Sequence, residues 1–158
     1  DMADLNIETS RMNLHDLRHL ISFRIGKKLS SDMSLLIQSF GYKNHIPIDS
    51  DIVFDVRCLK NPFWENELRP LDGRHKKIKA FLGQDEDVTN MTLDIIKYLE
   101  SWLPKFRASN RSYTTVSIGC TGGKHRSVYI CEQVFNHFNK NFDLIQIYHR
   151  EIKKIQND

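Results

Sequence analysis

Short strand-like runs alternate with amphipathic segments along this chain, and that alternation limits the available folds more than any other feature. Apolar and β-branched residues predict strands over 33–40, 51–57, 112–119 and 142–148. Between them, apolar residues recur at helical spacing and predict helices over 75–82, over 88–106 and from Gly122-Gly123 onward. Strands that alternate with helices build layered α/β folds. We therefore predict a small layered α/β domain with a mostly parallel sheet and flanking helices.

Length and cysteine content narrow the class of protein further. A chain of 158 residues is long enough for one domain with its own core. No apolar run approaches the roughly 18 residues of a membrane-spanning helix, so no membrane partner is expected. Cys58, Cys120 and Cys131 form no C-x-x-C pair, which argues against a zinc site and a disulfide framework. Unpaired cysteines suit a reducing compartment, and we expect a cytoplasmic protein.

The net charge of +3 hides an uneven distribution of charged residues. Residues 101–158 carry nine Lys or Arg against four Asp or Glu, a net of +5, whereas residues 1–100 carry 14 against 16. A basic C-terminal third favours an anionic partner. A solvated basic face is the alternative interpretation, and charge alone does not separate the two.

Polar and charged residues collect where the expected strands end. Lys43 follows the first strand, and Asp55 and Arg57 close the second. The segment Gly119–Ser127 follows the third strand, and His149-Arg150 follows the fourth. In parallel α/β sheets, ligands bind outside the carboxyl ends of the strands. We therefore expect one polar pocket at that edge of the sheet.

The segment Gly119–Ser127, GCTGGKHRS, is the strongest local signal. Glycines let a backbone approach a ligand closely, and successive amides at a helix N-terminus attract anions. Lys124, His125 and Arg126 add cationic donors, and Arg126 is suited to hold a phosphate bidentately. A tight strand-to-helix turn would explain the glycines but not three adjacent cations. The spacing is one residue too short for a Walker loop, so this segment is not a Walker-type nucleotide site.

The same segment also fits the pattern C-x-x-G-x-x-R-[ST] of cysteine-dependent phosphatases. In those enzymes a thiolate attacks phosphorus while backbone amides and an arginine hold the other phosphate oxygens. Here the pattern makes Cys120 the nucleophile and Arg126 the phosphate ligand, with Asp55 or Asp72 as the general acid. A phosphatase is therefore the alternative to a binding site.

Motifs spread in order along the chain resemble the RapZ/YvcJ family of bacterial P-loop nucleotide-binding proteins, which includes RNase adapters. They are Ala3–Leu5, Thr9-Ser10, Ser39–Lys43, Phe54–Arg57, Asn61-Pro62, Leu68–Leu71 with Gly73, Ile118–Val128 and His149-Arg150. The resemblance implies that residues 1–30 are the last strand and helix of an N-terminal P-loop domain, now missing. Residues 31–158 would be the C-terminal domain, similar to a lobe of phosphofructokinase. ATP or GTP would bind in the missing domain, and this fragment would hold no cofactor.

The resemblance also implies a regulatory role without catalysis by this fragment. The family's C-terminal domain is implied to bind small regulatory RNA, to sense glucosamine-6-phosphate and to present RNA to an endoribonuclease, within homo-oligomers. The sugar-phosphate pocket carried onto this chain comprises Lys43, Asp55, Arg57, Cys120, Gly122, Gly123, Lys124, His125, Arg126 and Ser127. The RNA contacts comprise Lys140, His149, Arg150, Lys153 and Lys154.

Three functions are open at this point. The first is a regulatory domain of an RNase adapter, which binds RNA and a phosphorylated amino sugar. In that pocket Asp55 would contact the sugar hydroxyls or amine, although pairing with Arg57 is the other role open to it. The second is the cysteine-dependent phosphatase, and the third is a plain oligomerisation domain without a ligand.

Overall fold

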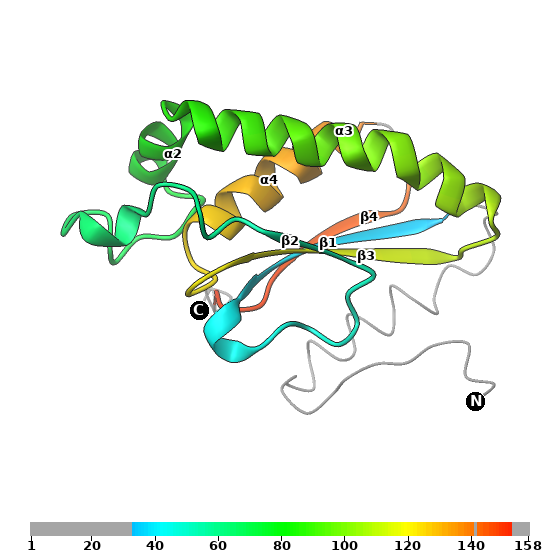
Figure 1. Cartoon of the computed structure of the whole chain (residues 1–158), viewed down its shortest axis with the longest axis horizontal. Helices are drawn as coiled ribbons and strands as arrows, with labels where there is room; N and C mark the ends of the chain where they lie inside the picture. The colour runs from blue at the N-terminus through cyan, green and yellow to red at the C-terminus, as the bar shows by residue number, and fades with distance from the viewer. Residues whose placement is uncertain (1–32, 141, 153–158) are drawn as a thin grey trace, which may run out of the picture.

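A computed structural model describes residues 33–140 and 142–152, which form a four-stranded sheet with helices packed against it (Figure 1). The strands are β1 (Ser34–Gly41), β2 (Ile52–Asp55), β3 (Tyr113–Cys120) and β4 (Ile145–His149). The helices are α2 (Lys76–Gly83), α3 (Glu86–Ala108) and α4 (Arg126–Phe138). Two 3-10 turns, η1 (Tyr42–Asn44) and η2 (Pro62–Trp64), follow β1 and β2. The predicted layered α/β class is confirmed.

The strands lie in the order β2-β3-β1-β4, and every neighbouring pair is parallel. The pairing of β1 with β3 joins Ser34 to Tyr113 and Gly41 to Cys120, so the two central strands run side by side over their whole length. All four carboxyl ends therefore lie at one edge of the sheet, at the left in Figure 1.

One face of the sheet is covered by the helices. Figure 1 shows α3 and α4 on the same side of the sheet, and α2 contacts both of them. The core between these layers consists of apolar side chains that are almost fully buried: Leu35 and Ile37 of β1, Val116 and Ile118 of β3, Ile95, Leu99 and Leu103 of α3, and Ile130, Cys131 and Val134 of α4. The helical residues recur at i, i+3 and i+4, which directs one stripe of each helix onto the sheet.

On the opposite face, hydroxyl and amide groups fasten the connection between β1 and β2. Gln38 lies opposite Ser117 in the sheet register, and its Nε2 donates to Ser117 Oγ at 2.9 Å. Ser50 Oγ lies 2.6 Å from Ser117 Oγ and also donates to the Pro47 carbonyl. Because these buried polar groups satisfy one another, the connection can cross the sheet and deliver β2 to the edge.

Local backbone geometry accounts for the expected boundaries that differ. The helix expected from Gly122 begins four residues later at Arg126, because Gly123 takes a φ of 67° that no α-helix contains. The strand expected to reach residue 57 ends at Asp55. α2 begins after His75, whose Nδ1 accepts a hydrogen bond from the Lys77 amide at 3.2 Å.

The strand and helix expected before residue 30 lie outside the described residues, so the division into domains stays a prediction. Within residues 33–140 and 142–152, no helix is both long and apolar enough to cross a membrane. Cys58, Cys120 and Cys131 are free thiols.

Candidate functional site

The carboxyl edge of the sheet brings together the four segments that the sequence singled out. Asp55 and Arg57 follow β2, and Lys43 follows β1. Residues 120–125, which we call the glycine loop, connect β3 to α4 between those positions. The amide of Lys43 donates to the Thr121 carbonyl at 3.2 Å, which fixes η1 against the glycine loop. The expected convergence of the strand ends is thus present in the structure.

The structure leaves no room for a side chain at two glycines of this edge but leaves room at a third. Gly41 and Gly123 interlock: a Cβ on Gly41 would lie 2.7 Å from the Gly122 carbonyl carbon, and one on Gly123 would lie 2.6 Å from the Gly41 nitrogen. A Cβ on Gly122 would meet no atom within 4 Å, and Gly122 does not have a positive φ. Neither backbone strain nor internal packing therefore requires glycine at position 122, whereas close approach of another molecule to the backbone would.

Lys124 and His125 border this open stretch of backbone. Lys124 Nζ donates to the carbonyls of Pro70 and Arg69 at 2.7 and 3.3 Å, which ties the loop before α2 to the glycine loop. His125 is only 6% exposed. Burial and the nearby Lys124 charge lower the pKa of His125, so its ring is neutral at physiological pH.

Arg126 makes contacts within the fold that the sequence did not reveal, and its contact with phosphate stays a prediction. Its Nη1 donates to the carbonyls of Arg57 and Leu59 at 2.7 and 3.0 Å, and its Nη2 donates to Thr121 Oγ1 at 3.4 Å. In this arrangement Arg126 fastens the segment after β2 to the start of α4, and both terminal nitrogens are engaged. Arg126 Nε and His125 Nε2 are buried without a hydrogen-bond partner in the described part of the chain. Buried polar atoms without partners usually face a ligand or an ordered water.

The phosphatase pattern is present, but the surroundings of Cys120, Asp55 and Asp72 do not favour phosphatase chemistry. Cys120 Sγ lies 3.2 Å from Ser127 Oγ, and Cys120 is 3% exposed and packs in the hydrophobic core. The Arg57 guanidinium, through its hydrogen bonds, lowers the pKa of Asp55. Burial alone would raise the pKa of Asp72, but hydrogen bonds and charge from Arg74 outweigh it and the pKa falls. The thiol is therefore enclosed, and both candidate acids are ionised at neutral pH.

Asp55 and Arg57 form an exposed ion pair at the end of β2. Arg57 Nη2 lies 2.6 Å from Asp55 Oδ2, and the guanidinium carbon lies 3.9 Å from the centroid of the Tyr42 ring. Of the two roles open to Asp55, pairing with Arg57 is the one in the structure. Since exposed pairs are worth at most about 1 kcal/mol, a ligand can displace this one readily. Sequence reasoning did not name Tyr42 as a site residue, although the motif Ser39–Lys43 contains it.

His149 also has partners that the sequence did not reveal. Its Nδ1 lies 2.9 Å from Ser39 Oγ within β1, and its Nε2 lies 3.0 Å from Glu132 Oε1 on α4. The hydrogen bond from His149 lowers the pKa of Glu132. Arg150 lies 3.9 Å from Asp49. These contacts hold β4 to its neighbours.

Within the described ranges, no group of three His, Cys, Asp or Glu is arranged to hold a metal ion.

Comparison with known proteins shows to which family the chain belongs. The family model described as the RapZ C-terminal domain matches residues 33–153, which include all described residues. The chain belongs to the RapZ C-terminal domain family.

Three relatives of the chain are each named a nucleotide-binding protein. Nucleotide-binding proteins of Nitrosococcus oceani, Hahella chejuensis and Cellvibrio japonicus are 53%, 47% and 46% identical to this chain, over 96%, 96% and 99% of it. The matched regions cover 54%, 53% and 52% of those proteins, so the chain spans about half the length of the curated relatives it matches.

In this RapZ C-terminal domain, the expected RNA contacts that the structure describes lie at two ends of the sheet. Lys140 is exposed just after α4, which runs back along the sheet, so it lies near the start of β4. His149 and Arg150 lie at the opposite edge and are engaged by Ser39, Glu132 and Asp49. Lys153 and Lys154 lie outside the described residues.

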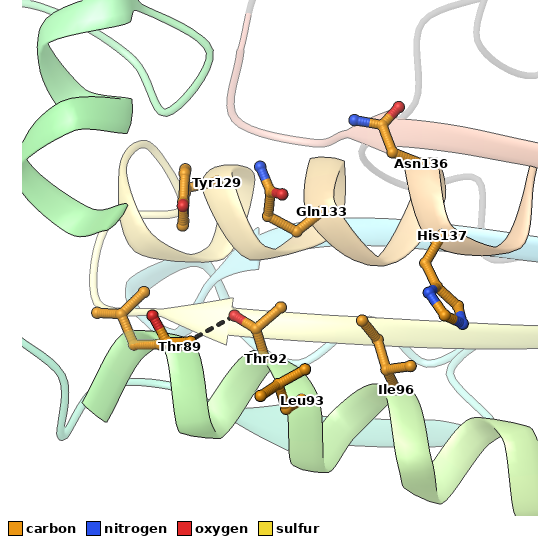
Figure 2. A pocket seen from close by; sticks show the side chains of 9 residues that line it. Thr89, Thr92, Leu93, Ile96, Tyr129, Gln133, Asn136 and His137 are labelled. Atoms are coloured by element: carbon orange, nitrogen blue, oxygen red, sulfur yellow. Dashed lines mark hydrogen bonds between the residues drawn. The ribbon is translucent and has the colours of Figure 1, made fainter. Parts of the chain in front are cut away.

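A groove of about 400 Å³ lies away from this edge, between α3 and α4. Figure 2 shows Thr89, Thr92, Leu93 and Ile96 of α3 facing Tyr129, Gln133, Asn136 and His137 of α4. None of the residues expected to bind phosphate or RNA lines it. The candidate functional site of the RapZ C-terminal domain is therefore the carboxyl edge of the sheet.

Proposed function

We propose that this chain is the regulatory domain of an RNase adapter and that the glycine loop binds a sugar phosphate, with glucosamine-6-phosphate as the first candidate. The observation that carries this proposal is Gly122, where the backbone is open and neither packing nor strain demands a glycine. The amides of residues 121–124 and the N-terminus of α4 supply the positive dipole ends that a phosphate needs. The unpartnered Nε2 of the neutral His125 supports the same placement.

Two side chains next to the loop suit the rest of such a ligand. The Asp55 carboxylate, once released from its exposed pair with Arg57, would accept hydrogen bonds from an amine or hydroxyls. Lys43 lies on η1 beside the loop and would add a positive charge for the phosphate. An amino-sugar phosphate therefore offers complementary charges to both groups.

The remaining parts of the proposal rest on family membership. Relatives called nucleotide-binding proteins extend well beyond the matched region, and we propose that ATP or GTP binds there and not in this domain. We propose further that the domain binds small regulatory RNA, presents it to an endoribonuclease, forms homo-oligomers and works in the cytoplasm. We assign it no catalysis of its own, because the enclosed Cys120 disfavours the phosphatase alternative.

Calorimetric titration of Gly122→Ala with sugar phosphates tests the pocket. A methyl group at position 122 fits the fold, since nothing lies within 4 Å, but it stands where the phosphate would approach. We expect wild type to bind glucosamine-6-phosphate saturably and the variant to bind it at least about tenfold more weakly, with unchanged thermal stability. Gly83→Ala, at the end of α2, is the matched control and should bind as wild type does.

The outcomes separate the three functions. Equal affinity of wild type and Gly122→Ala would remove the glycine loop from the site. No saturable binding of any sugar phosphate would leave an oligomerisation domain. Turnover of an aryl phosphate that is lost in Cys120→Ser would restore the phosphatase.

A further inference from the structure

An exposed pair of aromatic rings projects from the carboxyl edge of the sheet. Trp64 is 74% exposed and Phe63 is 44% exposed, and both lie in η2. In Figure 1 this turn is the coil between β2 and α2 that extends past the ends of the strands. Large aromatic side chains left in water forgo the burial that stabilises most of their kind, so this exposure calls for an explanation.

A buried proline and hydrogen bonds to side chains fasten the backbone of this turn. Pro62 is buried, and the Phe63 amide donates to Asn61 Oδ1 at 3.3 Å. Arg69 Nε donates to the Phe63 carbonyl at 3.1 Å. The two rings lie edge to face, with centroids 5.6 Å apart. The turn therefore presents the two rings side by side at the surface.

One cation contacts the Phe63 ring, and further cations lie in the neighbouring sequence. The Arg69 guanidinium carbon lies 4.7 Å from the centroid of the Phe63 ring. Residues 57–79 carry seven Lys or Arg against three Asp or Glu, a net of +4, and one of the acids, Glu67, is paired with Lys77 at 3.0 Å. α2, which contacts η2, supplies several of these cations. Lys124 joins the turn to the glycine loop through the Arg69 carbonyl.

We propose that Phe63 and Trp64 form a stacking platform for bases of single-stranded RNA, with Arg69 and the neighbouring lysines on its phosphates. Exposed aromatics interleaved with cations are the features by which proteins bind single-stranded nucleic acid. Two rings can stack on one or two bases. They are a small surface beside the roughly 800 Å² that each partner contributes to a stable protein interface, so RNA suits this site better than a protein does. The inference rests on the proposed RNA function and places the contact with RNA at η2 (Pro62–Trp64), which we call the aromatic turn.

The two tryptophans of the chain give a direct experiment. Trp102 on α3 is also exposed, at 41%, and has Lys105 Nζ 4.2 Å from its ring centroid, so it serves as an exposed tryptophan on another element. In Trp102→Phe, Trp64 is the sole tryptophan of the 158-residue chain. We expect a twelve-residue oligouridylate to quench its fluorescence to saturation, and inorganic polyphosphate, which has no bases, to leave it unquenched.

Affinity measurements complete the test. Trp64→Ala should weaken oligouridylate binding about five- to 150-fold without changing its salt dependence, since stacking neutralises no phosphate. Trp64→Phe should recover part of the loss, and Trp102→Ala should bind as wild type does. Unchanged affinity in Trp64→Ala, or RNA binding without quenching, overturns the platform and leaves the RNA function standing. No binding of RNA by wild type overturns both, while the sugar-phosphate titration remains an independent result.

Discussion

At the residue scale, His125 shows how burial sets the charge of a side chain beside an anion site. Its ring lies next to Lys124 and against the backbone of residues 68–71, and its pKa is lowered chiefly by burial. Sequence reasoning named His125 as a donor but could not give its protonation state, because that depends on neighbours far along the chain. The same limit applied to Asp55, which the residue types alone left between two roles.

Stability should therefore decline as the pH falls below about 6.5, the ordinary pKa of histidine. Below that value the unfolded chain binds a proton that folded His125 does not, so each pH unit favours unfolding by up to about 1.4 kcal/mol. The lowered pKa values of Asp55, Asp72 and Glu132 add to this loss only below about 4.5. Urea unfolding between pH 7 and 5 should show a flatter dependence for His125→Gln than for wild type. An equal slope in the two proteins would contradict the assignment, and His137→Gln on α4 is the control.

At the element scale, the strands and helices were predictable but their connections were not. Apolar and β-branched runs and helical patterns predicted every described strand and α-helix, because their apolar residues pack in the core. The order β2-β3-β1-β4 depends on pairs such as Ser34 with Tyr113, which no local pattern encodes. The contacts of Arg126 within the fold were missed for the same reason: its partners, the carbonyls of Arg57 and Leu59, lie 69 and 67 residues away.

Arg126→Met should consequently destabilise the fold by about 2–4 kcal/mol, because two carbonyls lose a charged donor in a buried place. Arg74→Met is the matched control, since Arg74 is exposed and pairs with Asp72, and it should lose less than about 1 kcal/mol. The midpoints of urea unfolding measure both. Equal losses in the two variants would mean that Arg126 does not pin the segment after β2. Loss of ligand binding in an Arg126 variant would then reflect the fold as well as any contact with phosphate.

At the scale of the whole molecule, the sheet topology decides which charges can act together. Parallel strands place the glycine loop, the Asp55–Arg57 pair and the aromatic turn at one edge. The basic C-terminal third suggested one cationic face that binds an anion, yet α4 carries the chain back and leaves Lys140 near the opposite edge. A count of charges along the sequence could not reveal this separation. We propose instead that RNA binds at the carboxyl edge, where residues 57–79 carry a net of +4 and the structure places Phe63 and Trp64.

The salt dependence of RNA binding should locate that surface. Each lost contact with a single-stranded phosphate lowers the slope of log K against log salt by about 0.7. Combined Lys60→Gln and Lys76→Gln changes at the basic edge should therefore flatten the slope by up to about 1.4, whereas Lys140→Gln should leave it unchanged. The pair Lys97→Gln and Lys105→Gln removes the same charge from α3 and controls for net charge alone. A slope that responds to Lys140 and not to Lys60 and Lys76 would place the RNA at the amino edge of the sheet. That outcome would separate RNA binding from both the glycine loop and the aromatic turn.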